Sequence, residues 1–373
     1  MVTALSVLNN AQRIVVKTGS SLIADLEGAR QGWLESLAED LVVYRKRGLD
    51  VILVTSGAVA LGRADINPAS PIRIEQKQAA AAVGQPRLMH ALAKAFAPHG
   101  VTLGQALLTL DDTEDRRRWL NARATMDTLL EAGILPIINE NDTLATDEIR
   151  YGDNDRLAAR VAQMTSADAL ILLSDVDGLY TADPRNNPNA EHIPHLDNLS
   201  PEHEAMASGA NADAGVGSGG MVTKLAAARI AHTAGCSTII TIGDREHPLL
   251  ALEQGGRATV LSAHTTPRKA RESWLHGHLK PEGSVHIDAG AAKALTGGAS
   301  LLPVGVLSVN GMFKRGAAVA IHGPDDAIIA HGITAYNSED IARVVGLKSE
   351  DVEDVLGYRG RPAIIHRDDM IKV

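Results

Sequence analysis

The sequence predicts an α/β fold in which a mostly parallel sheet is sandwiched by helices, followed by a small, mainly-β, barrel-like domain. Helical stretches that end in glycine alternate with short apolar runs through the first two-thirds of the chain. Continuously apolar runs are typical of strands buried on both faces of a parallel sheet. The length of 373 residues also exceeds one compact domain of ordinary size, so two domains are expected.

Glycines and apolar spacing mark the individual elements. Glycine just past the end of a helix adopts the left-handed conformation at little cost. Four such glycines, Gly48, Gly100, Gly133 and Gly235, precede the runs VILVT, VTLGQALL, ILPIIN and STIITI. Within residues 34–44, apolar side chains recur at spacings of three and four, which predicts an amphipathic helix between two strands.

The character of the chain changes near residue 262. Residues 263–280 are polar and basic, and we expect a linker there. From residue 281 to 373, short apolar runs punctuated by glycine predict a second domain built mainly from strands. The expected division is therefore a first domain over residues 1–262, the linker, and a domain over residues 281–373.

Composition narrows the function classes. The net charge of −9 lacks the basic excess that is typical of dedicated nucleic-acid binders. Cys236 is the only cysteine, so no intramolecular disulfide forms, and we expect it to be a small buried residue. The N-terminus shows no signal peptide and no run reaches the length of a membrane span, so a cytoplasmic protein without a membrane partner is expected.

Two segments place polar groups where strands end. In RIVVKTGSSL a strand leads to Lys17, and in VILVTSGAVALG a strand leads to Ser56 and then to a helix. In open α/β sheets ligands bind outside the carboxyl ends of the strands, and a helix N-terminus attracts anions. Each residue alone also fits a simpler interpretation, a solvated lysine for Lys17 and an ordinary N-cap serine for Ser56.

A third segment, PIINENDTLATDEIRYGDNDRLAARVA, is unusually rich in short polar side chains. Its amides and carboxylates are Asn139, Glu140, Asn141, Asp142, Asp153, Asn154 and Asp155. Carboxylates pair with an ammonium group and amides bind a carboxylate, so this set suits a zwitterionic ligand. A solvated loop is the alternative.

The fourth segment, GVGSGGMVTKLAAARI, is a glycine-rich loop that leads into a helix. No apolar strand precedes it, which argues against a dinucleotide fingerprint, and Lys224 stands too far from Gly220 for a Walker A loop. We interpret its amides as phosphate ligands and Lys224 as a contact to the transferred group. Ser174 and Asp175, at the end of another apolar run, are candidates for contacts to adenosine or ribose.

Taken in order, VVKTGSS, VTSGA, INENDT…GDND, LLSDVDGLYTADPR and GSGGMVTKL resemble the amino acid kinase family, over nearly the whole chain. The INENDT…GDND pair and the GSGGMVTKL loop are the specific parts of this resemblance, and they are most similar to the branch that phosphorylates glutamate. The segment from residue 281 onward resembles a PUA domain, which many members of that branch carry.

The resemblance implies roles for individual residues. Lys17 and Lys224 match the two lysines that neutralise the transferring phosphoryl group, and Asp155 matches the aspartate that holds them. Ser56, Asp142 and Asn154 match residues that bind glutamate. The expected nucleotide contacts are Lys17, Ser174, Asp175, Ser218, Gly219, Gly220, Met221, Val222, Thr223 and Lys224.

The resemblance also implies a reaction. ATP, with Mg²⁺, would phosphorylate the γ-carboxylate of glutamate in the first step of proline biosynthesis. No protein ligand of the Mg²⁺ ion is assigned. Proline is expected as a feedback inhibitor, glutamyl phosphate reductase as a transient partner, and a homo-oligomer as the assembly.

Two alternatives stay open at this point. One is another activity of the same family, on acetylglutamate, aspartate or uridylate. The other is RNA binding through the PUA-like domain, which the charge disfavours, because residues 281–373 hold nine basic and twelve acidic residues.

Overall fold

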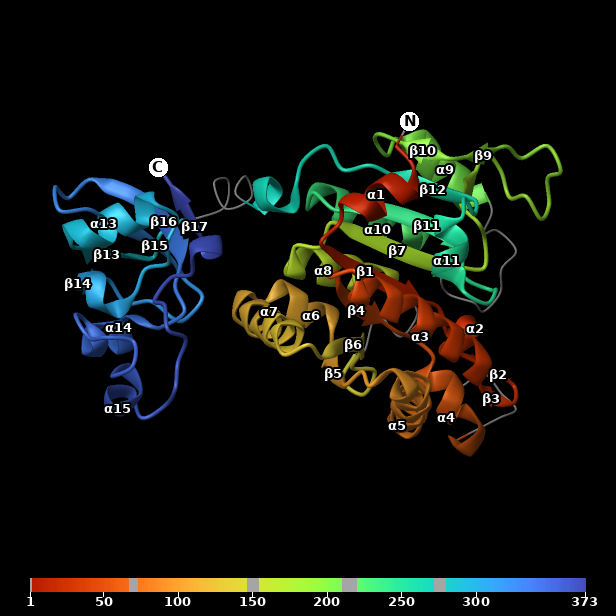
Figure 1. Ribbon diagram of the computed structural model, residues 1–373, viewed down its shortest axis with the longest axis horizontal. Helices are drawn as coiled ribbons and strands as arrows, with labels where there is room; N and C mark the ends of the chain where they lie inside the picture. Colours follow the sequence, from red (N-terminus) through yellow and green to blue (C-terminus); the bar gives the residue numbers. More distant parts are fainter. Residues whose placement is uncertain (1, 67–72, 146–153, 210–219, 272–279) are drawn as a thin grey trace. The chain divides into compact units, whose positions relative to one another are not determined.

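The computed structural model describes residues 2–66, 73–145, 154–209, 220–271 and 280–373. Contacts divide the chain into two compact units, Met1–Arg268 and Lys269–Val373. The first unit contains an eight-stranded sheet and the second a five-stranded sheet (Figure 1). Among the described residues, no helix combines the length and the apolar character needed to cross a bilayer.

The large sheet has the order β10-β12-β11-β7-β1-β4-β6-β5. Its strands are β10 (His195–Leu196), β12 (Ala258–Leu261), β11 (Ser237–Ile242), β7 (Ala169–Ser174), β1 (Arg13–Thr18), β4 (Asp50–Val54), β6 (Leu135–Glu140) and β5 (Leu103–Leu108). The six strands from β11 to β5 pair in parallel, and β12 pairs antiparallel with β11. The predicted mostly parallel sheet is therefore confirmed, and β1 lies in its middle.

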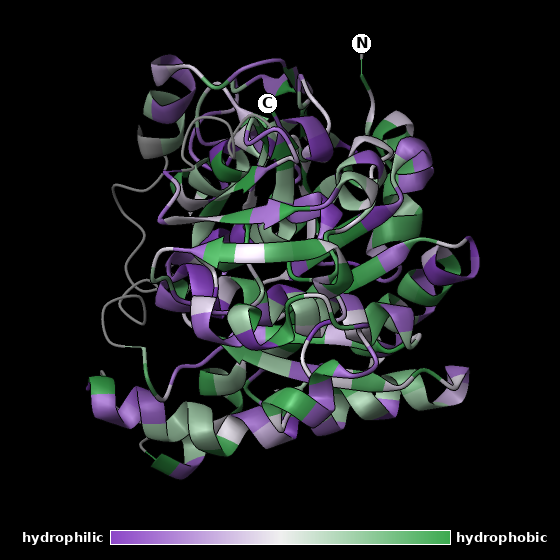
Figure 2. Cartoon of the chain, turned by 90° about the vertical axis from the view of Figure 1, so that its left-hand side faces the viewer, coloured by the Kyte–Doolittle hydropathy of each residue, from purple (hydrophilic) through white to green (hydrophobic). Residues whose placement is uncertain are grey.

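Helices cover both faces of this sheet (Figure 1). One face carries α1 (Ala4–Asn10), α3 (Gln31–Lys46), α5 (Ile74–Phe96) and α11 (Pro248–Glu253). The other face carries α7 (Arg116–Glu131), α8 (Asp155–Thr165), α9 (Pro201–Gly209) and α10 (Met221–Thr233). Helices show hydrophobic and hydrophilic residues along their length, as expected of elements with one side in the core and one in water (Figure 2).

The remaining elements of this unit are short. They are α2 (Ser20–Ile23), β2 (Ala24–Asp25), β3 (Gly28–Ala29), α4 (Ala58–Ile66), the 3₁₀ helix Ala97–His99, α6 (Leu110–Glu114), β8 (Leu179–Tyr180) and β9 (His192–Ile193). Helix α4 packs closely on α5 because Gly62 and Gly84 face each other's backbones. A Cβ atom on Gly84 would lie 1.8 Å from the carbonyl oxygen of Ala58, so only glycine permits this approach.

The alternating direction of side chains along β1 determines which layer of helices Lys17 faces. Ile14 and Val16 belong to the core that contains α3 and α5, whereas Val15 belongs to the core that contains α8 and α10. Successive side chains of a strand point to opposite faces, so Lys17 points to the same face as Val15. The sheet thereby directs Lys17 toward the α8 and α10 layer.

One expectation about burial is wrong. The run that forms β5 was expected to be buried on both faces, but β5 is an edge strand that pairs only with β6 in this sheet. Gln105 and Leu107 are exposed, Leu107 by 38%, and Leu108 is the one buried residue of the strand. Continuous apolarity does not distinguish a central strand from an edge strand, because the position in the sheet is set by the other strands.

The second unit is built around the sheet β14-β13-β15-β16-β17. Its strands are β13 (Gly283–Ile287), β14 (Val306–Asn310), β15 (Ala318–His322), β16 (Ile328–Ile333) and β17 (Met370–Lys372). The helical segments are α13 (Ala289–Thr296), α14 (Ser338–Val344), α15 (Val352–Leu356) and the 3₁₀ turns Pro303–Gly305 and Arg367–Asp369. Only β13 and β15 pair in parallel, and a separate apolar core fills this unit. A small, mainly-β second domain is confirmed.

Candidate active site

A buried ion cluster lies at the carboxyl end of β1. Oδ1 of Asp155 is 2.5 Å from Nζ of Lys17, and Oδ2 of the same carboxylate is 3.3 Å from Nζ of Lys224. Asp155 is fully buried, and the side chains of the two lysines are only 5% and 6% exposed. The structure thus brings together, from β1, α8 and α10, the three residues expected to be catalytic.

The chemistry of this cluster favours an anionic ligand. Burying a charge is costly unless a partner compensates it, and these two ammonium groups share one carboxylate. Taken by themselves, the three groups carry an excess of positive charge. An anion placed beside the lysines would balance that excess in a site of low dielectric constant, where its attraction is strong.

The first turn of α10 adds hydrogen-bond donors. Gly220 is the N-cap residue and makes no side-chain capping bond, while Oγ1 of Thr223 lies 2.7 Å from the Gly220 carbonyl and 3.4 Å from Oδ2 of Asp155. Helix N-termini present unbonded amides and a partial positive charge to anions. Met221 and Val222 stand at this terminus as expected. Ser218 and Gly219 lie outside the described residues.

A chain of amide hydrogen bonds lies beside the cluster. Nδ2 of Asn154 donates to the Thr55 carbonyl at 2.5 Å and to Oδ1 of Asn139 at 2.7 Å. Nδ2 of Asn139 donates in turn to Oε1 of Gln85 at 2.7 Å. These contacts connect the end of β4, the end of β6, α5 and the N-cap of α8. They fix Asn154 next to the first residue of α8, Asp155.

Ser56 is a buried residue with an unpaired hydroxyl. The residue is 5% exposed, and its Oγ is buried without a hydrogen-bond partner among the described residues. Nε2 of Gln85 is likewise buried without a hydrogen-bond partner among the described residues. Buried polar atoms normally have partners, so unsatisfied ones at the ends of strands are typical of a binding site without its ligand.

Asp142 follows β6 and has a perturbed ionisation. Burial raises the pKa of its carboxyl to about 6. No contact joins it to the lysine cluster among the described residues, and its neighbours at 146–153 are outside them. A poorly solvated carboxylate attracts a cation more strongly than an exposed carboxylate does. This property suits the expected contact between Asp142 and an ammonium group.

Ser174 and Asp175 lie at the carboxyl end of β7, the strand next to β1. Oγ of Ser174 lies 3.1 Å from Oδ1 of Asp175, whose other oxygen lies 3.7 Å from the Arg185 guanidinium. Ser174 is 4% exposed, whereas the Asp175 side chain is 61% exposed. Both lie at the same end of the sheet as Lys17, and neither contacts the lysine cluster in the described interactions.

Comparisons with known proteins identify the family. A sequence model described as the amino acid kinase family matches residues 12–241, and one described as the PUA domain matches residues 283–356. The chain belongs to the amino acid kinase family. The resemblance noted in the sequence is therefore confirmed for both parts.

Two glutamate 5-kinases are similar in sequence to this chain over nearly its full length. Glutamate 5-kinase of Paramagnetospirillum magneticum is 53% identical over 369 residues, which cover 98% of this chain and 99% of that protein. Glutamate 5-kinase of Rhizobium etli is 50% identical over 371 residues, covering 99% and 95%. The UMP kinase of Ureaplasma parvum aligns with 67% of this chain and 98% of its own at 18% identity and a TM-score of 0.47, too low to carry weight.

Sequence reasoning missed one residue of the amide chain. Gln85 lies inside α5, far along the chain from every polar motif, and no local pattern marks it. Its place in the amide chain depends on the close packing of α4 on α5. Asn139 was part of the polar cluster, but its bond to Asn154 became visible only in the folded structure.

Cys236 is buried at the start of β11, as expected. Burial raises the pKa of its thiol far above the neutral range, so a nucleophilic thiolate does not form there.

Proposed function

We propose that this protein transfers the γ-phosphoryl group of ATP to the γ-carboxylate of L-glutamate, forming L-glutamyl 5-phosphate in the first step of proline biosynthesis. The observation that carries the proposal is the pair of buried lysines joined by one carboxylate, Lys17 and Lys224 on Asp155. The full-length similarity to glutamate 5-kinases supports the choice of substrate over acetylglutamate, aspartate or uridylate.

The reaction needs charge neutralisation more than proton transfer. A glutamate side chain has an ordinary pKa of about 4.3 and is already an anionic nucleophile at neutral pH. Two unit charges 4 Å apart repel by roughly 4 kcal/mol at an effective dielectric constant of 20. Two lysine ammonium groups and the N-terminal amides of α10 offset this repulsion and align the transferring group.

Asp155 acts in this proposal as a positioning residue. Each oxygen of its carboxylate faces a different lysine, so it holds two like charges close together before the substrates arrive. Lysines that are already in place need no reorganisation when charge develops on the phosphoryl oxygens, which is the source of electrostatic catalysis.

Glutamate would bind beside the lysines, among the polar ends of β4 and β6. Ser56 and Asn154 offer a hydroxyl and an amide to its carboxylates, and Asp142 offers a carboxylate to its ammonium group. The nucleotide would lie over the end of β7, in contact with Ser174 and Asp175, and with the segment 218–224.

We propose Mg²⁺ as the metal cofactor. The donor set fits an ion held through substrate, because both oxygens of Asp155 already contact lysines and leave no carboxylate in the cluster for the metal. Bound to phosphate oxygens and water, as this ion prefers, Mg²⁺ would neutralise further charge on the triphosphate.

The decisive experiment is trapping of the acyl phosphate product. The purified protein, glutamate, ATP and Mg²⁺ are incubated with hydroxylamine, which converts an acyl phosphate to a hydroxamate. We expect hydroxamate to form with glutamate and not with aspartate, N-acetylglutamate or UMP in its place. Formation of ADP without hydroxamate, or a preference for another acceptor, would overturn the proposed function.

Further proposals concern regulation and context. We propose inhibition by proline at or near the glutamate site, a transient contact with glutamyl phosphate reductase, a homo-oligomeric assembly and a cytoplasmic location. The lability of acyl phosphates in water favours direct transfer to a reductase. We also propose that the domains span residues 1–262 and 281–373, with a linker between them. The excess of acidic residues in the second domain disfavours RNA binding by it.

A further inference from the structure

Two histidines of the second unit lie side by side on one sheet face. His286 is the last residue of β13 that pairs with β15, and His322 ends β15. The two residues are direct partners in the parallel pairing of these strands. Their rings stack with centroids 4.7 Å apart and planes 18° from parallel. Each also lies at a register irregularity, between β13 and β14 for His286 and between β15 and β16 for His322.

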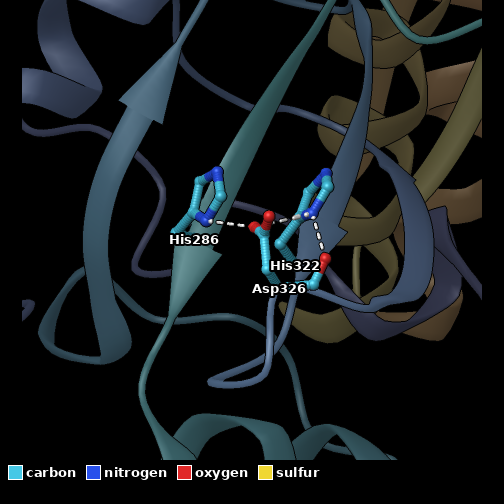
Figure 3. Close-up of side chains that lie close together, drawn as sticks. All are labelled: His286, His322 and Asp326. Atoms are coloured by element: carbon cyan, nitrogen blue, oxygen red, sulfur yellow. Dashed lines mark hydrogen bonds and ion pairs between the residues drawn. The ribbon is translucent and has the colours of Figure 1, made fainter.

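Asp326 completes the group from the turn between β15 and β16. Its backbone adopts a left-handed conformation, φ 61°, which few residues other than glycine, asparagine and aspartate tolerate. In Figure 3 its carboxylate lies between the two rings. Oδ1 of Asp326 is 3.3 Å from Nδ1 of His286 and 3.3 Å from Nδ1 of His322. Three unusual backbone features thus converge on one small group of side chains.

We propose that His286, His322 and Asp326 form a binding site for a divalent transition-metal ion of the zinc class. Zinc bound tetrahedrally at about 2.0–2.1 Å places its ligand atoms about 3.3 Å apart, and both separations to Oδ1 of Asp326 equal this value. Among the described residues, this is the group of His, Cys, Asp and Glu side chains whose ligand atoms come close enough to hold an ion.

The ligand types select zinc rather than calcium or magnesium. Imidazole nitrogens suit Zn²⁺, Co²⁺ and Ni²⁺, whereas Ca²⁺ and Mg²⁺ prefer sites made of oxygen alone. The Asp326 side chain is 77% exposed and the histidines are 27% and 20% exposed, so water reaches the remaining coordination position. Three protein ligands and an open position are typical of an exchangeable zinc site.

The surroundings of the rings also fit metal ligation. The side-chain amide of Asn310 lies 3.2 Å from Nε2 of His286, and an amide turned to present its oxygen would accept the proton of that nitrogen. Nδ1 of His322 lies 2.8 Å from the carbonyl oxygen of Asp326 and donates to it while no ion is bound. Binding an ion through that nitrogen moves the ring proton to Nε2, so the imidazole stays neutral. Since only an unprotonated nitrogen binds a metal ion, the affinity falls as the pH is lowered.

The test uses the full-length protein after removal of metal with a chelator. Titration with Zn²⁺ by calorimetry is expected to give one ion per chain at this site, with affinity that weakens between pH 7.5 and 5.5. Co²⁺ serves as a spectroscopic probe, because tetrahedral cobalt absorbs visible light far more strongly than the hydrated ion. The site lies outside the proposed kinase machinery, so glutamate phosphorylation supplies a check of folding.

Matched variants separate this site from other histidines. Asp326→Asn keeps the left-handed turn, and His322→Gln keeps the length of the side chain; each should weaken the binding at least tenfold, since even outer partners of a metal ligand contribute 10–100-fold. His366→Gln removes another histidine of the same unit that pairs with an aspartate, at 3.4 Å from Asp368, and should leave the binding unchanged. Binding weaker than millimolar in the wild type, or equal binding in Asp326→Asn and wild type, would overturn the proposal and leave an ordinary His–Asp hydrogen-bonded group.

Discussion

Lys17 and Lys224, separated by more than half of the chain, contact opposite oxygens of one buried carboxylate. Lys17 arrives at the end of the central strand β1, and Lys224 arrives in the first turn and a half of α10. Buried like charges are stable together only with a compensating anion, and the Asp155 carboxylate contacts both ammonium groups. The first two predictions follow from this relationship.

Removing Lys224 should reduce turnover far more than substrate binding. We expect Lys224→Ala to lower kcat by about 10²–10³-fold, the usual cost of removing one group that stabilises developing charge, with a small change in the KM for glutamate. Steady-state kinetics measures both constants. Lys94→Ala, which removes an exposed lysine from α5, is the matched control and should behave as wild type. Turnover of Lys224→Ala near the wild-type value would contradict the assigned role.

Neutralising Asp155 should cost stability as well as activity. In Asp155→Asn two buried ammonium groups lose their shared carboxylate, and removing one partner of a buried ion pair typically costs about 3–5 kcal/mol. The free energy of unfolding is measured in urea. Adding Lys17→Met should restore part of the lost stability, because one uncompensated charge disappears, but should restore no activity. A double variant less stable than Asp155→Asn would show that the carboxylate does not serve to hold Lys17.

Ser56 should affect substrate binding without affecting folding. Its hydroxyl has no partner among the described residues, so Ser56→Ala breaks no hydrogen bond in the free protein and should change the free energy of unfolding by less than about 0.5 kcal/mol. The KM for glutamate should rise about tenfold, as expected for a lost hydrogen bond of about 1.5 kcal/mol to a charged group. A destabilised variant with an unchanged KM would assign Ser56 to a structural cap instead.

The affinity for glutamate should depend on pH through Asp142. Burial raises the pKa of this carboxyl to about 6, so protonation removes the charge that pairs with the substrate ammonium as the pH falls through 6. We expect kcat/KM for glutamate to decline below about pH 6, since this ratio reports ionisations of the free enzyme. Asp142→Asn should raise the KM and abolish that part of the pH profile.

The same shift has a consequence for stability. The folded protein binds the Asp142 proton more tightly than the unfolded chain does, so the ionised carboxyl destabilises the fold at neutral pH. This cost shrinks as the pH falls below about 6 and is gone only below the ordinary pKa of the unfolded chain, about 3.9. Asp142→Asn should therefore be at least as stable as wild type at pH 7.

A profile of kcat/KM that is identical in wild type and variant would remove Asp142 from the substrate site.

The contact between α4 and α5 should be sensitive to a single methyl group. In Gly84→Ala the added Cβ would lie 1.8 Å from the carbonyl of Ala58, so the helices must separate, and overpacking of this kind costs about 1–3 kcal/mol. The shift also displaces Gln85 and should raise the KM for glutamate. Gly32→Ala in α3, where a Cβ meets nothing within 4 Å, is the control and should be neutral or slightly stabilising. Equal stability of the two variants would contradict the close packing.

The α/β class, the main elements and the family follow from local patterns in the amino-acid sequence. Apolar runs behind glycines predicted β4, β5, β6 and β11, because burial on a parallel sheet demands continuous apolar residues and a helix end demands a left-handed residue. The polar residues at strand ends were predictable for a similar reason: only there does a buried strand meet a ligand crevice. The exposed edge position of β5 was not predictable, because strand order is not encoded in the strand itself.

Which polar residues meet depends on how the strands and helices pack together. Strand alternation in β1 directs Lys17 toward α8 and α10, and the parallel pairing of the strands brings residues far apart in sequence to one end of the sheet. The bond of Asn154 to Asn139, the place of Gln85 and the group His286, His322 and Asp326 all depend on neighbours from other strands and helices. Periodicity and local motifs contain no information on such pairings, since these arise from packing between elements that are distant along the chain.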